Sequence, residues 1–150
     1  IMELLQNMKA KNEKKDNKGF SLVELIVVIA IMAVLVGVLA PQLIKYVEKS
    51  REATDIQTCD NIATALKTYY ADEEVAATTV TVTLGKTELG TVADTAVKDA
   101  GLTKAKIKGT KWTGDKITIE YNKADGTITY TGDSPYYHSD KDQFKKGPKS

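Results

Sequence analysis

The sequence predicts an α+β fold in which a small antiparallel β-sheet packs on a long N-terminal helix. Three observations support this prediction. From Leu25 to Ala40 every residue is aliphatic, Met or Gly, which is typical of a helix that crosses a membrane. The chain then keeps apolar residues at three- to four-residue steps up to Ala71, as one face of a helix does. After Glu74 the composition changes to alternating runs rich in Thr, Val, Ile and Tyr, which indicate short strands.

We divide the chain into four segments. Residues 1–19 are polar and contain five lysines and three acidic residues. Residues 20–44 form the apolar half of the helix, residues 45–71 its amphipathic half, and residues 72–150 a globular head with a polar tail. Because lysines precede the apolar run and few follow it closely, the positive-inside rule predicts a cytoplasmic N-terminus and an external head.

Charge and composition exclude several function classes. The formal net charge is +1, which gives no basic field to attract nucleic acid. The chain has one cysteine, Cys59, and one histidine, too few for a Cys/His zinc site or a histidine-based catalytic triad. We therefore expect no enzymatic activity and no cofactor.

The apolar segment from Phe20 to Ile44 spans 25 residues, or about 37 Å as a helix, enough to cross a bilayer. It could act as a permanent anchor, as a cleavable secretory signal, or as a helix that leaves the bilayer to pack elsewhere. A secretory signal is disfavoured, because Pro41 would directly follow the cut and the run is longer than a typical signal.

Gly37 and Pro41 predict a weak point in this helix. Proline has no N–H, so the carbonyl that loses its partner is that of Gly37, a residue that itself weakens helices. The spacing of four predicts a kink or local unwinding, although single Gly and Pro residues are also tolerated in membrane helices.

Glu24 is the one acid inside the apolar segment, and a charge there is costly. Locally, Ser21-x-x-Glu24 reads as a capping box, in which Glu24 satisfies the first N–H groups of its own helix. The negative charge also suits the positive end of the helix dipole. Local physics leaves open whether Glu24 has a further role.

In the amphipathic half, the predicted buried stripe consists of apolar residues, namely Ile56, Cys59, Ile62, Ala63, Leu66, Tyr69 and Tyr70. We expect the charged residues before and around it to be exposed and to form weak pairs between Lys45 or Lys49 and the acids three or four positions away. These charged residues are Lys45, Glu48, Lys49, Arg51, Glu52 and Asp55.

The head shows three local patterns. Val80, Val82 and Leu84 alternate with threonines as in a half-buried strand. Thr91-x-x-Asp94 is expected to cap a short helix with Val92, Ala96, Val97 and Ala100 as its apolar residues and Gly101 at its end. Two alternating runs, Ile117–Tyr121 and Ile128–Tyr130, flank a hairpin loop at residues 122–126.

Two further parts of the head carry expectations. Trp112 is expected to anchor the core, with carbohydrate stacking as the minor alternative. Residues 134–150 are expected to form a polar coil or a loosely held tail.

The segment Lys18-Gly19-Phe20-Ser21-Leu22-Val23-Glu24-Leu25, followed by the apolar run, resembles the class III signal of type IV pilins and their relatives. The resemblance is close over roughly residues 15–45. It implies a pilin-like fold, cleavage between Gly19 and Phe20 by a prepilin peptidase, and N-methylation of Phe20 by the same enzyme. Residues 1–19 would then be a leader peptide that is removed on maturation.

The resemblance also implies an assembly mechanism. Glu24 would neutralise the Phe20 ammonium of a neighbouring subunit as a helical filament of identical subunits grows. Pro41 matches the helix-kinking proline of the family, and Gly37 falls in the segment that unwinds in assembled pili. The partners would be the peptidase, an assembly platform and its ATPase motor. The precursor would lie in the cell membrane and the mature subunit in an extracellular pilus.

The chain departs from the pilin pattern in two respects, and two other functions are compatible with its sequence. The leader is long and contains acids, and the pair of C-terminal cysteines of many Gram-negative pilins is absent, as in cysteine-poor Gram-positive pilins. A pseudopilin of a type II secretion or DNA-uptake system would carry the same signal, and some of these hold calcium. The oxygen ligands available for calcium near the C-terminus are Asp133, Ser139, Asp140 and Asp142. The less favoured alternative is a single-pass surface protein that binds a ligand.

Overall fold

The computed structural model describes residues 21–71 and 79–150. The leader segment 1–19, the Gly19–Phe20 bond and residue Phe20 itself lie outside the described residues. By internal contacts the chain divides into two compact units, Ile1–Ile44 and Lys45–Ser150.

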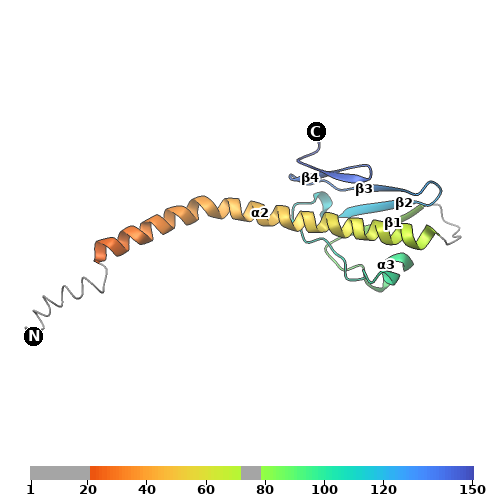
Figure 1. The fold of residues 1–150 in the computed structure, drawn as a ribbon, viewed down its shortest axis with the longest axis horizontal. Helices are drawn as coiled ribbons and strands as arrows, with labels where there is room; N and C mark the ends of the chain where they lie inside the picture. Colours follow the sequence, from red (N-terminus) through yellow and green to blue (C-terminus); the bar gives the residue numbers. More distant parts are fainter. Residues whose placement is uncertain (1–20, 72–78) are drawn as a thin grey trace, which may run out of the picture. The chain divides into compact units, whose positions relative to one another are not determined.

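A single helix, α2, runs from Leu22 to Ala71 (Figure 1). The predicted helix from near Ser21 to about Ala71 is therefore confirmed. The helix is unbroken over Gly37 and Pro41, so the predicted weak point has not unwound in the isolated chain.

The apolar half of α2 is exposed along its whole length. Its large side chains from Leu22 to Ile44 are 48–72% accessible, and this stretch is long and apolar enough to cross a membrane. Exposed apolar patches of this extent mark a surface that is covered by lipid or by another protein. This half of the helix therefore needs a partner outside the single chain.

In the second unit, three antiparallel strands pair in the order β1-β2-β3. They are β1 (Thr79–Leu84), β2 (Ile117–Asn122) and β3 (Thr127–Thr131). In register, Val82 faces Ile119, which in turn faces Tyr130. Alternate side chains therefore point to one face, which is buried, while the threonines of β1 are exposed. The predicted strands and the hairpin at residues 122–126 are confirmed.

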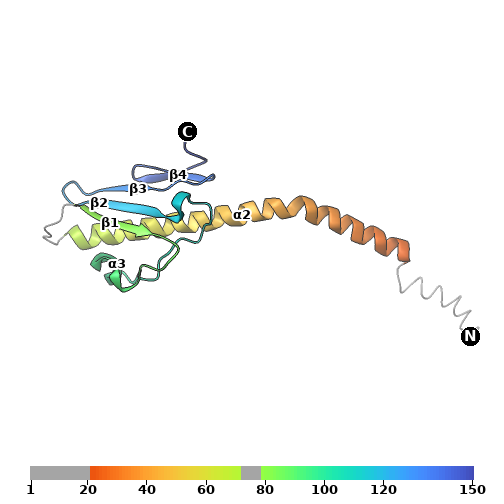
Figure 2. The ribbon, with the colours of Figure 1, turned by 180° about the vertical axis from the view of Figure 1, so that it is seen from behind.

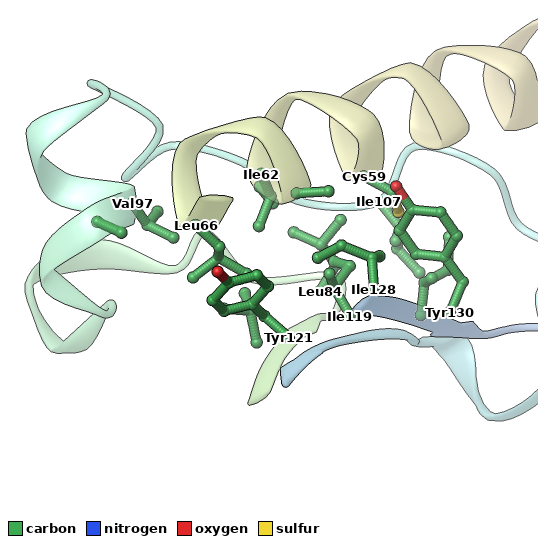
Figure 3. Close-up of a cluster of buried hydrophobic side chains, with 14 of the residues drawn as sticks. Cys59, Ile62, Leu66, Leu84, Val97, Ile107, Ile119, Tyr121, Ile128 and Tyr130 are labelled. Atoms are coloured by element: carbon green, nitrogen blue, oxygen red, sulfur yellow. The ribbon is translucent and has the colours of Figure 1, made fainter. Parts of the chain in front are cut away.

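The core lies between this sheet and the amphipathic half of α2 (Figure 2). Figure 3 shows Cys59, Ile62 and Leu66 of α2 directed at apolar side chains of the strands. Those of the strands are Leu84, Ile119, Tyr121, Ile128 and Tyr130. Fully burying such a side chain stabilises the fold by about 1.5–3 kcal/mol. The helix thus supplies the packing surface that a small sheet needs for stability.

A short helix, α3 (Thr95–Asp99), contributes Val97 to this core. The prediction that Thr91 caps it is wrong: Asp94 is the N-cap, and its carboxylate accepts the N–H of Ala96. Thr91 belongs to a separate 3-10 turn, Gly90–Val92, in which Val92 is 91% exposed. The cap therefore lies three residues later, because Asp94 is the residue with extended backbone before the first helical turn.

The C-terminal region differs from the predicted coil. It forms a second sheet from β4 (Tyr137–Asp140) and β5 (Gln143–Lys146). The hairpin is tied to the first sheet, since the N–H of Tyr130 donates to the carbonyl of Lys141 at 2.7 Å. The ring of Phe144 lies 5.1 Å from that of Tyr130 and 5.7 Å from that of Trp112. These aromatic contacts hold the β4–β5 hairpin against the first sheet, although its sequence is polar and shows little alternation of apolar and polar residues.

Candidate functional site

The start of α2 is closed by two reciprocal hydrogen bonds. The N–H of Ser21 donates to Oε2 of Glu24 at 3.0 Å, and the N–H of Glu24 donates to Oγ of Ser21 at 3.1 Å. This pair is the predicted capping box. Within the described part of the chain, the other oxygen of Glu24, Oε1, accepts no hydrogen bond. The carboxylate thus caps its own helix with one oxygen, and the other has no donor among the described residues.

The predicted weak point lies on the same exposed helix. Both Gly37 and Pro41 are exposed, and a Cβ on Gly37 would meet nothing within 4 Å. Packing among the described residues therefore places no constraint on either side chain.

The amphipathic half of α2 carries a buried acidic cluster that the sequence pattern did not reveal. Glu48, Glu52 and Asp55, here called the acidic clamp, are 6%, 0% and 0% exposed. We predicted all three to be exposed, with Glu48 and Glu52 paired to Lys45 or Lys49, and that prediction is wrong. They face the head because their spacing of four and three continues the buried stripe of α2 backwards.

Asp55 is the centre of the clamp. Its Oδ1 accepts the N–H of Lys108 at 2.7 Å, and its Oδ2 accepts the N–H of Gly109 at 2.8 Å. Oδ2 also accepts the indole N–H of Trp112 at 2.9 Å. A buried carboxylate is tolerated when its oxygens are satisfied in this way, so Asp55 fixes the 108–112 loop on the helix.

Glu48 and Glu52 accept the remaining hydrogen bonds of the clamp. Glu48 accepts the N–H and the hydroxyl of Thr110, each at 2.8 Å, while Glu52 accepts the hydroxyl of Ser134. Oε2 of Glu52 is buried and receives no hydrogen bond from a donor among the described residues. This position suits a protonated carboxyl that donates toward Glu48.

The two glutamates differ in acidity for physical reasons. Burial, helped by the hydrogen bond to Glu48 and the negative charges of Glu48 and Asp55, raises the pKa of Glu52 to about 7, against the lowering effect of the hydrogen bond from Ser134. Burial also acts to raise the pKa of Glu48, but hydrogen bonds from Glu52 and Thr110 bring it below its ordinary value. Glu52 therefore takes up a proton as the pH falls through about 7, while Glu48 keeps its charge there.

The loop meets the clamp closely because it has a glycine at the point of contact. A Cβ on Gly109 would lie 2.7 Å from Cγ of Glu52 and 3.0 Å from oxygens of Glu48 and Asp55. The spacing of the acids in the register of the buried stripe was the available sequence signal. Burial was not predicted from this spacing because acidic side chains are almost always exposed unless they are paired.

We expect Gly109→Ala to destabilise the head by about 1–3 kcal/mol, because the added methyl group overpacks the clamp. The free energy of unfolding can be measured on the full chain in detergent micelles from the fluorescence of Trp112, the only tryptophan. Gly85→Ala is the matched control, since its Cβ would have a nearest contact of 3.9 Å. Equal stability of the two variants would contradict the close fit at Gly109.

The C-terminal acids considered for calcium do not gather in one place. Asp140 forms an ion pair with Lys145, Asp142 is exposed in the β4–β5 turn, and Oδ1 of Asp133 is buried without a partner among the described residues. In residues 21–71 and 79–150, no group of three or more His, Cys, Asp or Glu side chains is placed to hold a metal ion. Nothing in this region therefore adds support for a calcium site.

Two single residues behave as predicted. Trp112 is 2% exposed and anchors the core. Cys59 is fully buried, and burial raises the pKa of its thiol, so it serves as a small apolar residue rather than a reactive group.

The comparisons with known proteins bear on the N-terminal part of the chain. Residues 14–40 match the model of the prokaryotic N-terminal methylation motif. Neither the curated proteins nor the solved structures contain a significant match to the chain. Residues 14–40 thus carry the class III signal of type IV pilins, at the head of a chain whose long apolar helix and small antiparallel sheets are consistent with a pilin-like fold.

Proposed function

We propose that the chain is the precursor of a pilin, a structural subunit without enzymatic activity. A prepilin peptidase cuts it between Gly19 and Phe20 and methylates the new N-terminus. The mature subunit then leaves the membrane, with an assembly platform and its ATPase motor, and joins a helical filament on the cell surface. The observation that carries this proposal is the methylation motif of residues 14–40 continuing into an apolar helix whose surface is exposed along its length.

A filament provides the partner that this helix needs. About 25 cal/mol is gained per Å² of apolar surface removed from water, and neighbouring helices would cover what the membrane covers before assembly. A permanent anchor would leave the same helix in lipid, but it would not need a cleavage signal directly before Phe20.

Glu24 acts as the register residue in this proposal. An ammonium and a carboxylate taken out of water offset their desolvation costs only when they pair with good geometry. Oε1 of Glu24 has no donor within the described part of the chain, and the methylated amine of Phe20 in a neighbouring subunit would supply one. The pair therefore fixes the axial position at which one subunit settles on the next.

We expect Glu24→Gln to abolish filaments while leaving insertion and cleavage intact. Glutamine can still accept the N–H of Ser21, so the cap is kept and only the charge is lost. Electron microscopy of shed filaments and mass spectrometry of the N-terminus are the two measurements, with a loss of filaments of more than about tenfold expected, as from an unpaired buried charge.

Ser21→Ala is the matched control for this experiment. It removes the hydroxyl that caps Glu24 but keeps the acid, so filaments should still form. Normal filaments from Glu24→Gln would refute the register role. Failure of prepilin peptidase to cut the Gly19–Phe20 bond would instead refute the filament function and favour a single-pass surface protein.

The same motif and helix also fit a pseudopilin of a type II secretion or DNA-uptake system. Electron microscopy distinguishes the two assignments, since a pilin forms long surface filaments and a pseudopilin a short assembly. A rise in melting temperature with calcium but not magnesium would favour the pseudopilin.

A further inference from the structure

An open groove of about 380 Å³ lies in the second unit, next to the start of the amphipathic half of α2. It is lined by basic, aromatic and small residues, namely Lys45, Lys49, Pro135, Tyr136, Tyr137, Lys146 and Gly147. No acidic side chain is among them. The volume is in the range of small-ligand sites.

The three lysines of the groove are not neutralised within the described residues. The ion pairs among the described residues are Lys86–Asp115 and Lys145–Asp140, and neither involves a lysine of the groove. The acids nearest in sequence on α2 are unavailable, because Glu48 and Glu52 turn inward to Thr110 and Ser134. The burial of the acidic clamp thus leaves a local excess of positive charge on the outer surface of the same helix turns.

The aromatic wall of the groove is held in place. The N–H groups of Tyr136 and Tyr137 both donate to Oγ of Ser134 at 3.1 Å. The N–H of Gly147 donates to the carbonyl of Tyr136 at 2.6 Å, and Tyr137 faces Lys146 across the hairpin. Through Ser134, whose hydroxyl bonds to Glu52, this wall is connected to the clamp.

Lys49 is placed between two rings. Its Nζ lies 5.8 Å from the ring centroid of Tyr46 and 5.5 Å from that of Tyr136, within cation–π range. The ammonium is thereby kept at the groove, where an anion can reach it.

The position in the chain indicates which anion. Lys45 is the first residue after the apolar run, and Lys49 follows one turn later. Lysine and tyrosine are the residues that settle at the headgroup level of a bilayer, and each lysine there attracts anionic lipid. When the apolar run spans a membrane, Lys45 therefore lies at the headgroups.

We propose that this groove binds the phosphate-bearing headgroup of an anionic phospholipid in the outer leaflet while the subunit is in the membrane. The inference rests on the part of the proposed function in which the precursor spans the bilayer. Lys45, Lys49 and Lys146 supply the charge, and Tyr136 and Tyr137 border the headgroup. The headgroup is released when the subunit enters the filament.

The test measures lipid retention by the full precursor in detergent micelles. Native mass spectrometry is run with dioleoylphosphatidylglycerol and with dioleoylphosphatidylcholine. The variant is Lys45→Gln/Lys49→Gln/Lys146→Gln. The control with the same charge change is Lys67→Gln/Lys98→Gln/Lys104→Gln, whose lysines are exposed elsewhere on the second unit. Inorganic phosphate at millimolar concentration is added in a separate arm.

We expect wild type and control to retain phosphatidylglycerol over phosphatidylcholine. The groove variant should lose affinity for it by on the order of a hundredfold, about fivefold for each lysine near a membrane surface. Equal retention of the two lipids by wild type, or unchanged binding of phosphatidylglycerol by the groove variant, would overturn the proposal.

Two other outcomes would assign the groove to a different occupant. Displacement of the lipid by inorganic phosphate would make it a site for free phosphate. Unchanged lipid binding together with loss of filaments in the groove variant would make it a contact with a second copy of the chain. Because lipid retention is measured before cleavage, its result is independent of the Glu24→Gln experiment and of the peptidase experiment.

Discussion

Replacing Asp55 with alanine should destabilise the head by about 3–5 kcal/mol, since three donors, two of them fully buried, lose their acceptor at once. These donors are the N–H groups of Lys108 and Gly109 and the indole of Trp112. Typical domains have a total stability of only about 5–15 kcal/mol, so the variant should be close to unfolded at growth temperature. Urea unfolding of the full chain in micelles measures the change.

Asp55→Asn serves as the conservative variant and Asp99→Ala as the control at an exposed acid. Asparagine keeps one acceptor oxygen but turns an amide toward an N–H group, so its cost should be intermediate. Asp99, at the end of α3, is exposed, and its replacement should change stability by less than about 0.5 kcal/mol. A small effect of Asp55→Ala, comparable to that of Asp99→Ala, would show that the loop is held by packing rather than by the clamp.

The stability of the head should fall as the pH rises from about 4.5 to about 7. In the unfolded chain Glu52 titrates at its ordinary pKa of 4.5, whereas in the folded head its pKa is about 7. Between these values the native state binds a proton that the unfolded state has lost, so the free energy of unfolding decreases with increasing pH. At 1.36 kcal/mol per unit, the total loss is about 3 kcal/mol. Chemical unfolding at pH 5 and pH 8 measures it.

Other groups with shifted pKa values act outside this pH window. The lowered pKa values of Glu48, Asp125 and Asp140 affect stability below their ordinary values of 4.5 and 3.8. Tyr70, whose pKa burial raises to about 12, acts above 10. A fall in stability between pH 5 and pH 8 can therefore be assigned to Glu52 by one substitution.

Glu52→Gln is that substitution. Its carbonyl oxygen can accept the Ser134 hydroxyl and its amide can donate toward Glu48, so it imitates the protonated acid. We expect a flat stability profile from pH 5 to pH 8 and a gain of about 3 kcal/mol over wild type at pH 8. Glu120→Gln, on an exposed position of β2, should keep the wild-type profile. A variant of Glu52 with the wild-type slope would exclude it as the titrating group.

The sequence by itself determined the features that depend on local pattern. The apolar run and its stripe predicted the helix to Ala71, the alternation of Val80 to Leu84 predicted β1, and Ser21-x-x-Glu24 predicted a capping box that the structure contains. The methylation motif is likewise contained in contiguous residues. Each of these features involves residues within a few positions of one another, so periodicity and spacing carry the information.

Only the tertiary structure decided the fate of the buried acids and of the C-terminal segment. Asp55 meets Gly109 across 54 positions, and Glu52 meets Ser134 across 82, distances over which local pattern carries no information. A carboxylate is buried only if such remote donors arrive, because its desolvation is otherwise too costly. Likewise β5 has Phe144 as its one large apolar residue, and it becomes a strand because Tyr130 and Trp112 provide the surface on which that ring packs.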